Sequence, residues 1–145
     1  MPRERFSENH TFLPKRAFLS FEEIEKVVRS CMSLGLEKVR ITGGEPLLRK
    51  DLPRLIEMLS GLGIEIALTT NASLLKKEAK ALHSAGLTRV TVSLDALDPE
   101  LHRTMSDSNI SVDSVLEGID EAIRVGLSPV KINCVVQKGV NEEEV

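Results

Sequence analysis

One plan occurs three times along the chain: a helix ends at a glycine, and a short loop then leads into a strand. The three copies cover residues 33–42, 84–93 and 124–133, and their glycines are Gly35, Gly86 and Gly126. Strands that alternate with helices form parallel βαβ units with right-handed crossovers. No low-complexity linker interrupts the series, and 145 residues suffice for one buried core. The sequence therefore predicts a single α/β domain over residues 1–145.

Local signals predict where the elements lie. A capping box at Ser20 and Glu23 begins a helix that Gly35 ends, and Ile24, Val27, Val28, Cys31 and Leu34 form its apolar stripe. Further helices are expected from a cap at Asp51 to about 62, over 74–85, from Asp98-Pro99, and from Ser111 or Asp113 to Gly126. Strands are expected at 39–42, 64–70, 89–94 and 130–136.

The expected strands have one apolar face and one polar face, because side chains alternate with a period of two. The apolar face must receive the helices, and it carries Val39, Ile41, Ile66, Leu68, Val90, Val92, Leu94, Val130, Ile132 and Cys134. The polar face carries Arg40, Thr42, Thr69, Thr91, Ser93, Asp95, Lys131 and Asn133.

A polar face that contains two cations is unusual for a parallel sheet. An open doubly wound sheet is covered by helices on both sides and is largely apolar on both. Unpaired burial of Arg40 and Lys131 would cost several kcal/mol each. A curled sheet around a wet lumen that holds an anionic ligand removes this penalty. The alternative is a half-exposed sheet with a solvated polar face.

The segment after the first expected strand has the composition of a ligand-binding loop. Gly43 and Gly44 lack a Cβ, so the backbone can adopt unusual dihedral angles and approach a bound molecule closely. Glu45 adds an anionic acceptor that suits an amino group, and Pro46 stiffens the exit. A tight strand-to-helix connection without a ligand is the alternative.

Composition narrows the class of protein further. A net charge of −3 and an aromatic content of 3% argue against a nucleic-acid-binding surface. No apolar stretch approaches the roughly 18–20 residues of a membrane span, and the first residues lack the apolar region of a secretory signal. Two cysteines do not form a disulfide framework, which favours a cytoplasmic, reducing setting.

Several motifs resemble those of the radical S-adenosylmethionine enzymes. They are Ile-Thr-Gly-Gly-Glu-Pro-Leu-Leu-Arg at 41–49, Thr-Thr-Asn at 69–71, Val-Ser-Leu-Asp at 92–95 and Val-Lys-Ile-Asn-Cys-Val-Val at 130–136. With Phe-Leu-Pro-Lys at 12–15 and Gln-Lys-Gly-Val-Asn at 137–141, the chain is most similar to the GTP 3′,8-cyclases of molybdenum cofactor biosynthesis.

This resemblance implies a segment of a partial (β/α)6 TIM-like barrel with outer helices. It implies S-adenosylmethionine and a 4Fe–4S cluster as cofactors, GTP as the substrate and a reductant as a partner. The 5′-deoxyadenosyl radical would convert GTP into 3′,8-cyclo-7,8-dihydro-GTP. The resemblance assigns S-adenosylmethionine to Gly43, Gly44, Glu45 and Ser93, and GTP to Arg40, Thr69 and Lys131. It assigns no catalytic side chain and no metal ligand in this chain.

The chain departs from the family pattern at the cluster. The motif Cys-x-x-x-Cys-x-x-Cys is absent, and Met1-Pro2 matches the residues that follow its third cysteine. We therefore expect a core segment truncated at both ends that is inactive alone. Cys31 and Cys134 are expected to be small buried apolar residues.

The three histidines and Ala72 carry weaker signals. His83 is expected near a helix C-terminus, and His10 and His102 are expected to be solvated, with no metal-ligand spacing among them. Ala72 stands where the family usually has a glycine, so a turn with positive φ could be strained there.

Two alternative functions stay open from the sequence. One is another radical S-adenosylmethionine enzyme, such as one that matures peptides. The other is a non-catalytic nucleotide-binding fragment. A homodimer is possible with either.

Overall fold

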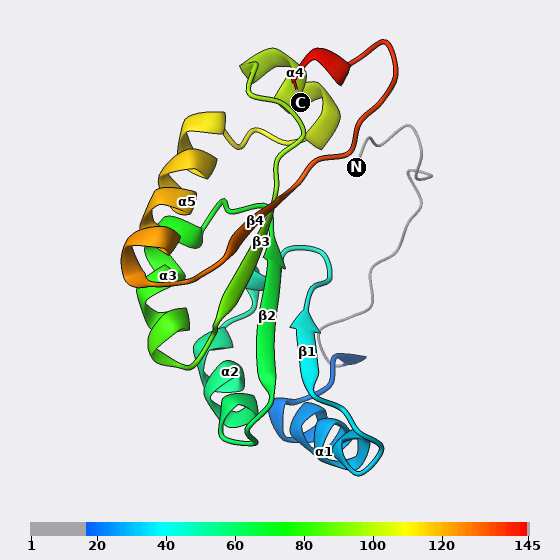
Figure 1. The fold of residues 1–145 in the computed structure, drawn as a ribbon, viewed down its shortest axis with the longest axis vertical. Helices are drawn as coiled ribbons and strands as arrows, with labels where there is room; N and C mark the ends of the chain where they lie inside the picture. Colours follow the sequence, from blue (N-terminus) through cyan, green and yellow to red (C-terminus); the bar gives the residue numbers. More distant parts are fainter. Residues whose placement is uncertain (1–16, 145) are drawn as a thin grey trace.

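The computed structural model describes residues 17–144, which form one layer of helices against a parallel sheet (Figure 1). The elements in chain order are α1 (Phe21–Met32), β1 (Lys38–Ile41), the 3₁₀ helix η3 (Pro46–Leu48), α2 (Leu52–Ser60), β2 (Glu65–Thr70), α3 (Leu75–Ser84), β3 (Arg89–Ser93), α4 (Pro99–Ser106), α5 (Val112–Val125), β4 (Val130–Asn133) and the 3₁₀ helix η4 (Glu142–Glu144).

The sheet has the order β1-β2-β3-β4, and each neighbouring pair of strands is parallel. The helices α2, α3 and α5 lie along one side of it, and α4 lies beyond the carboxyl ends of the strands (Figure 1). This arrangement confirms the predicted α/β architecture with parallel strands and outer helices. Each strand pairs with the next one in sequence, so a helical crossover joins every pair, and such crossovers are right-handed in nearly all proteins.

The apolar face of the sheet forms the core, as strand parity predicted. Ile66, Leu68, Val90 and Val92 are fully buried there under the helices. Burial of each such side chain contributes about 1.5–3 kcal/mol to stability. The open face of the sheet is thereby left to the polar side chains.

The fourth strand is shorter than predicted. It ends at Asn133, and Val135 donates its backbone N–H to Asp95 Oδ1 over 2.8 Å instead of to a strand. Ile132, which was expected to face the helices fully, remains 50% exposed. The prediction of a strand over 134–136 is therefore wrong, because a side chain satisfies the backbone donor there.

The predicted helix signals were right at some positions and wrong at others. Ser20 and Glu23 form both bonds of the capping box, and Ser111 caps α5. Asp51 precedes α2 but has a left-handed backbone (φ 58°) and makes no side-chain capping bond, so its predicted capping role is wrong. Of the expected stripe on α1, Val27 and Leu34 are exposed, and Leu34 lies beyond the end of the helix at Met32.

Candidate functional site

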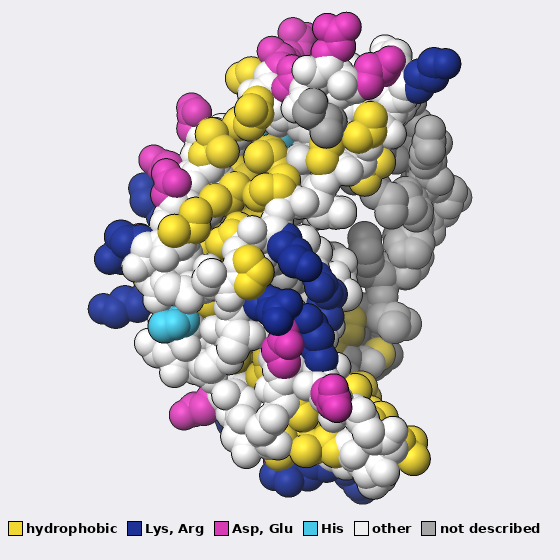
Figure 2. Space-filling view, in the orientation of Figure 1, with side chains coloured by type: hydrophobic (Ala, Val, Ile, Leu, Met, Phe, Trp, Pro, Cys, Tyr) yellow, Lys and Arg dark blue, Asp and Glu magenta, His cyan; other side chains and the backbone are white. Residues whose placement is uncertain are grey.

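The polar face gathers the three residues that were assigned to GTP. Thr69, Thr91 and Lys131 lie opposite one another on β2, β3 and β4. Arg40 lies opposite Ala67, two residues before Thr69, and therefore points to the same face. Figure 2 shows Lys and Arg side chains gathered over this side of the sheet. The predicted placement of Arg40 and Lys131 on one face is confirmed by this register.

Hydroxyl groups on two strands hold the guanidinium of Arg40. Its Nη1 donates to Thr69 Oγ1 over 3.1 Å and to Thr91 Oγ1 over 2.9 Å. Arginine carries five N–H donors, so this arrangement leaves others for a ligand. The result is a cation with a fixed direction on the same face as Lys131, and two such cations can bind an anion with spread charge, such as a phosphate chain.

An acid balances part of the positive charge at the amino-terminal edge of the sheet. Glu65 Oε1 lies 2.8 Å from Lys38 Nζ and 2.9 Å from Arg89 Nε. The hydrogen bond from Lys38 holds the pKa of Glu65 below its ordinary value; partial burial opposes this shift, and the charges of Arg89, Lys38 and Arg40 reinforce it. Arg89 and Lys38 are thereby paired within the protein. Arg40 and Lys131 are the cations that the polar face offers to a ligand.

The residues assigned to S-adenosylmethionine lie at the carboxyl edge of the sheet. Gly43 and Gly44 follow β1, and Ser93 is the last residue of β3. Gly43 has a φ of 149°, which few side chains adopt, and a Cβ built on either glycine would meet no atom within 4 Å. The space above these glycines is therefore open, and a ligand can approach their backbone directly.

Glu45 has a different setting from the open acceptor that the sequence suggested. Its Oε1 accepts hydrogen bonds from Leu47 N (3.0 Å) and Thr70 Oγ1 (2.7 Å), and its Oε2 accepts one from Asn71 N (2.8 Å). Both oxygens thus bind the chain itself. The carboxylate joins the loop after β1 to the end of β2.

Sequence reasoning did not assign Thr70, Thr91 and Asn141 to the site. Asn141 is buried and donates to the carbonyl oxygens of Asp95 (2.6 Å) and Val135 (3.0 Å), which fixes the segment after β4 to the end of β3. The polar face predicted from strand parity included Thr91, and the Gln-Lys-Gly-Val-Asn motif included Asn141. The Thr-Thr-Asn motif at 69–71 included Thr70, although it gave this residue no role.

The two cysteines lie at opposite edges of the sheet. Cys31 is in the last turn of α1, which leads into the amino end of β1, whereas Cys134 follows the carboxyl end of β4. Both are free thiols and only half-buried, so full burial was not the right expectation. Over residues 17–144, no three His, Cys, Asp or Glu side chains lie together as a metal site would require.

The histidines divide into two cases. His83 is exposed in the last turn of α3, as predicted. His102 was expected to be solvated, but it is only 5% exposed, because α4 turns this side of the helix inward. Within the described chain its Nδ1 has no hydrogen-bond partner. His10 lies outside the described residues, as do Met1-Pro2 and the 12–15 motif.

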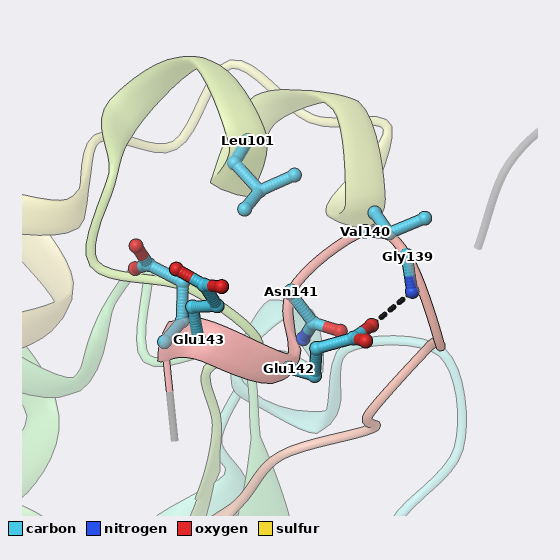
Figure 3. A pocket seen from close by; sticks show the side chains of 7 residues that line it. Leu101, Gly139, Val140, Asn141, Glu142 and Glu143 are labelled. Carbon is cyan, nitrogen blue, oxygen red and sulfur yellow. Dashed lines mark hydrogen bonds between the residues drawn. The ribbon is translucent and has the colours of Figure 1, made fainter.

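A cavity of about 320 Å³ lies away from the polar face, between α4 and the end of the chain (Figure 3). Leu101 of α4 and residues 139–144 line it, and Glu142 accepts a hydrogen bond from Gly139 N. None of the residues assigned to GTP or S-adenosylmethionine lines this cavity. It has three acids on its wall and therefore does not suit an anionic ligand.

No helix in the described part of the chain is long and apolar enough to span a bilayer.

Known proteins resemble this chain at the level of family, sequence and fold. The Radical SAM superfamily matches residues 5–145. The GTP 3′,8-cyclases of Acidothermus cellulolyticus and Staphylococcus carnosus are 50% and 51% identical to it over the whole chain. The chain spans only 41% and 43% of the lengths of these two relatives.

Solved structures give the same picture of the fold. SuiB of Streptococcus suis bound to S-adenosylmethionine matches 92% of the chain with a TM-score of 0.73 and 26% identity, over 31% of its own length. Methylornithine synthase (PylB) matches 84% of the chain with a TM-score of 0.65, over 36% of its own length; at 21% identity it supports the fold alone. From the superfamily match over nearly its full length, the chain belongs to the radical SAM superfamily.

Proposed function

We propose that this chain is a core segment of a GTP 3′,8-cyclase and binds GTP across its polar face. In this proposal Arg40, Thr69 and Lys131 contact GTP, and the cations bind the triphosphate. The observation that carries the proposal is the row that these three residues and Thr91 form on one face of four neighbouring strands, with Arg40 held by two threonine hydroxyls. The whole-chain identity to named GTP 3′,8-cyclases supports GTP over other anions.

S-adenosylmethionine fits the carboxyl edge of the sheet. The open space over Gly43 and Gly44 admits the amino-acid part of the molecule to the loop backbone, and Ser93 offers a hydroxyl at the end of β3. When bound and reduced in such enzymes, S-adenosylmethionine supplies a 5′-deoxyadenosyl radical for abstraction of a hydrogen atom from the substrate. The role of this chain is to orient both molecules over one face and to limit access of water.

A 4Fe–4S cluster does not fit the described residues. Such a cluster is held by several converging thiolates, whereas Cys31 and Cys134 lie at opposite edges of the sheet. We therefore assign no step of the reaction to a cluster held by this chain. We propose a cytoplasmic, reducing setting with an external reductant, which accords with the two free thiols.

Isothermal titration of the purified chain with GTP and with S-adenosylmethionine tests the proposal. We expect Lys131→Ala to weaken GTP binding by about tenfold or more, the effect of losing a charge-assisted contact, and to change S-adenosylmethionine binding by less than about twofold. The matched control is Lys77→Ala, which removes an exposed lysine of α3 away from the sheet. Equal weakening of both ligands by Lys131→Ala would contradict the assignment.

A second candidate is an enzyme that matures peptides, and the likeness to SuiB favours it. SuiB bound to its precursor peptide SuiA matches this chain with a TM-score of 0.71 and 26% identity. Titration with SuiA under the same conditions separates the two functions. Binding of the peptide without binding of GTP would favour this candidate. Binding of GTP without its conversion into 3′,8-cyclo-7,8-dihydro-GTP would favour a nucleotide-binding role without chemistry.

A further inference from the structure

Glu45 and Thr70 connect the glycine loop to the turn that follows β2. Glu45 begins η3 and accepts hydrogen bonds from Leu47 N, Thr70 Oγ1 and Asn71 N over 3.0, 2.7 and 2.8 Å. An ionised carboxylate has about four acceptor positions, and three are already in use here. The side chain therefore faces the protein, with little capacity left for a ligand's amino group.

The connection continues through the hydroxyl of Thr70. This hydroxyl donates to Glu45 and also accepts a hydrogen bond from Ala72 N over 3.0 Å, and Thr70 is only 2% exposed. Ala72 has a φ of 62°, an uncommon conformation for a residue with a side chain. The hydrogen bond from Ala72 N helps to hold this conformation, so the turn and the glycine loop depend on one buried hydroxyl.

We propose that Glu45 and Thr70 are positioning residues, which fix the backbone of Gly43 and Gly44 so that it can bind the amino-acid portion of S-adenosylmethionine. This inference rests on the proposed function for the identity of the ligand. It differs from a direct contact between Glu45 and the amino group, because the carboxylate acts through the loop. Open space over both glycines leaves their backbone as the surface presented to the ligand.

The test uses three substitutions in the chain and two measurements. Thr70→Val removes the hydroxyl while keeping the shape, Thr70→Ser keeps the hydroxyl, and Glu45→Gln replaces one acceptor oxygen with a donor. The first measurement is the Kd for S-adenosylmethionine and the Kd for GTP, both obtained by NMR titration. The second is amide hydrogen exchange at Leu47 and Asn71, which reports the connection without any ligand.

We expect Thr70→Val and Glu45→Gln to weaken S-adenosylmethionine binding by about tenfold, to leave GTP binding within about twofold, and to speed exchange at Asn71 by about tenfold. Thr70→Ser should keep S-adenosylmethionine binding and exchange at Asn71 close to the values of the unaltered chain. Weakening of both ligands alike, or weakened S-adenosylmethionine binding in Thr70→Ser, would show a general structural defect and overturn the inference. Retained S-adenosylmethionine binding in Thr70→Val and Glu45→Gln would overturn it as well.

The hydrogen-exchange measurement separates this inference from the proposed function. If the unaltered chain binds no S-adenosylmethionine, the proposed ligand is wrong. Unchanged exchange at Asn71 in Glu45→Gln would instead show that the connection does not hold the loop, whatever the ligand.

Discussion

At the scale of the residue, the site depends on side chains that hold other groups in place. Thr91 and Thr69 direct Arg40, and Glu45 directs the loop after β1. Parity alone predicted the shared face of Arg40, Thr69 and Lys131, because the period of two is a property of any strand. It could not predict that Glu45 meets Thr70, since these residues are 25 apart in sequence and belong to different elements, the loop after β1 and the end of β2.

Ala72 shows how a residue-scale departure from the family pattern is tolerated. The left-handed backbone of Ala72 costs about 1–2 kcal/mol of stability. A glycine at this position would avoid that cost. It would, however, remove a buried methyl group worth about 0.8 kcal/mol and increase the entropy cost of folding by about 0.5–1 kcal/mol. We expect Ala72→Gly to change the free energy of unfolding by less than about 1 kcal/mol. Ala72→Val should lower it by more than about 2 kcal/mol, because a β-branched side chain resists this φ. Urea denaturation of the unaltered chain and of the two variants measures both values. A strongly stabilising Ala72→Gly would show that the strain at this φ outweighs the loss of the methyl group and of chain entropy.

At the scale of the element, caps and ion pairs set how firmly the edges of the sheet are held. The helix signals that worked, Ser20 and Ser111, are those in which a side chain bonds a nearby backbone N–H. Asp51 carries the same sequence signal, but its backbone is left-handed and its side chain makes no capping bond. The length of β4 could not be predicted, because Asp95, from another loop, ends it.

The capping box of α1 gives a direct stability test. Ser20→Ala removes the acceptor for Glu23 N, and we expect a loss of about 1 kcal/mol in the free energy of unfolding. Ser30→Ala is the control, since the Ser30 hydroxyl bonds the Lys26 carbonyl inside the helix and contributes little. Thermal denaturation followed by circular dichroism compares the two. A loss as large in Ser30→Ala as in Ser20→Ala would mean that the cap itself is not responsible.

The ion pairs of Glu65 predict a dependence of stability on pH. Because folding lowers the pKa of Glu65, its contribution is present above the unfolded-state pKa and is lost as the pH falls through the folded-state pKa. We expect Glu65→Gln to lower Tm at neutral pH and to reduce the difference in Tm between neutral pH and about pH 3. Glu143→Gln, at an exposed position in η4, should leave that difference unchanged. An unaltered difference in Glu65→Gln would show that these pairs contribute nothing.

At the scale of the whole molecule, the sheet has an uncovered edge. Within residues 17–144, β4 pairs only with β3, and Ile132 on this strand and Val135 and Val136 after it are exposed. A strand whose outer edge is unpaired, with apolar side chains exposed beside it, can associate with a further strand. The repeating plan of the sequence predicted the order of the elements, but it carried no information on how β4 is covered.

We therefore expect the purified chain to self-associate, in keeping with the homodimer considered from the sequence. Ile132→Lys places a charge on β4 and should shift the chain toward the monomer. Leu34→Lys is the control, because this residue is 87% exposed after α1, at the other end of the sheet order. Sedimentation velocity at several concentrations measures the change. A chain that is monomeric at every concentration, or an equal effect of Leu34→Lys, would contradict an interface at β4.

The two hydroxyls that hold Arg40 have a consequence for engineering. A free arginine loses up to about 2 kcal/mol of side-chain entropy when an anion immobilises it, and here folding has already restricted the guanidinium. Position 91 carries no charge, yet exchanging its threonine for serine or valine would loosen or release this cation. Selectivity among phosphorylated compounds could thus be adjusted from a neutral position on a neighbouring strand, with every charge on the sheet left unchanged.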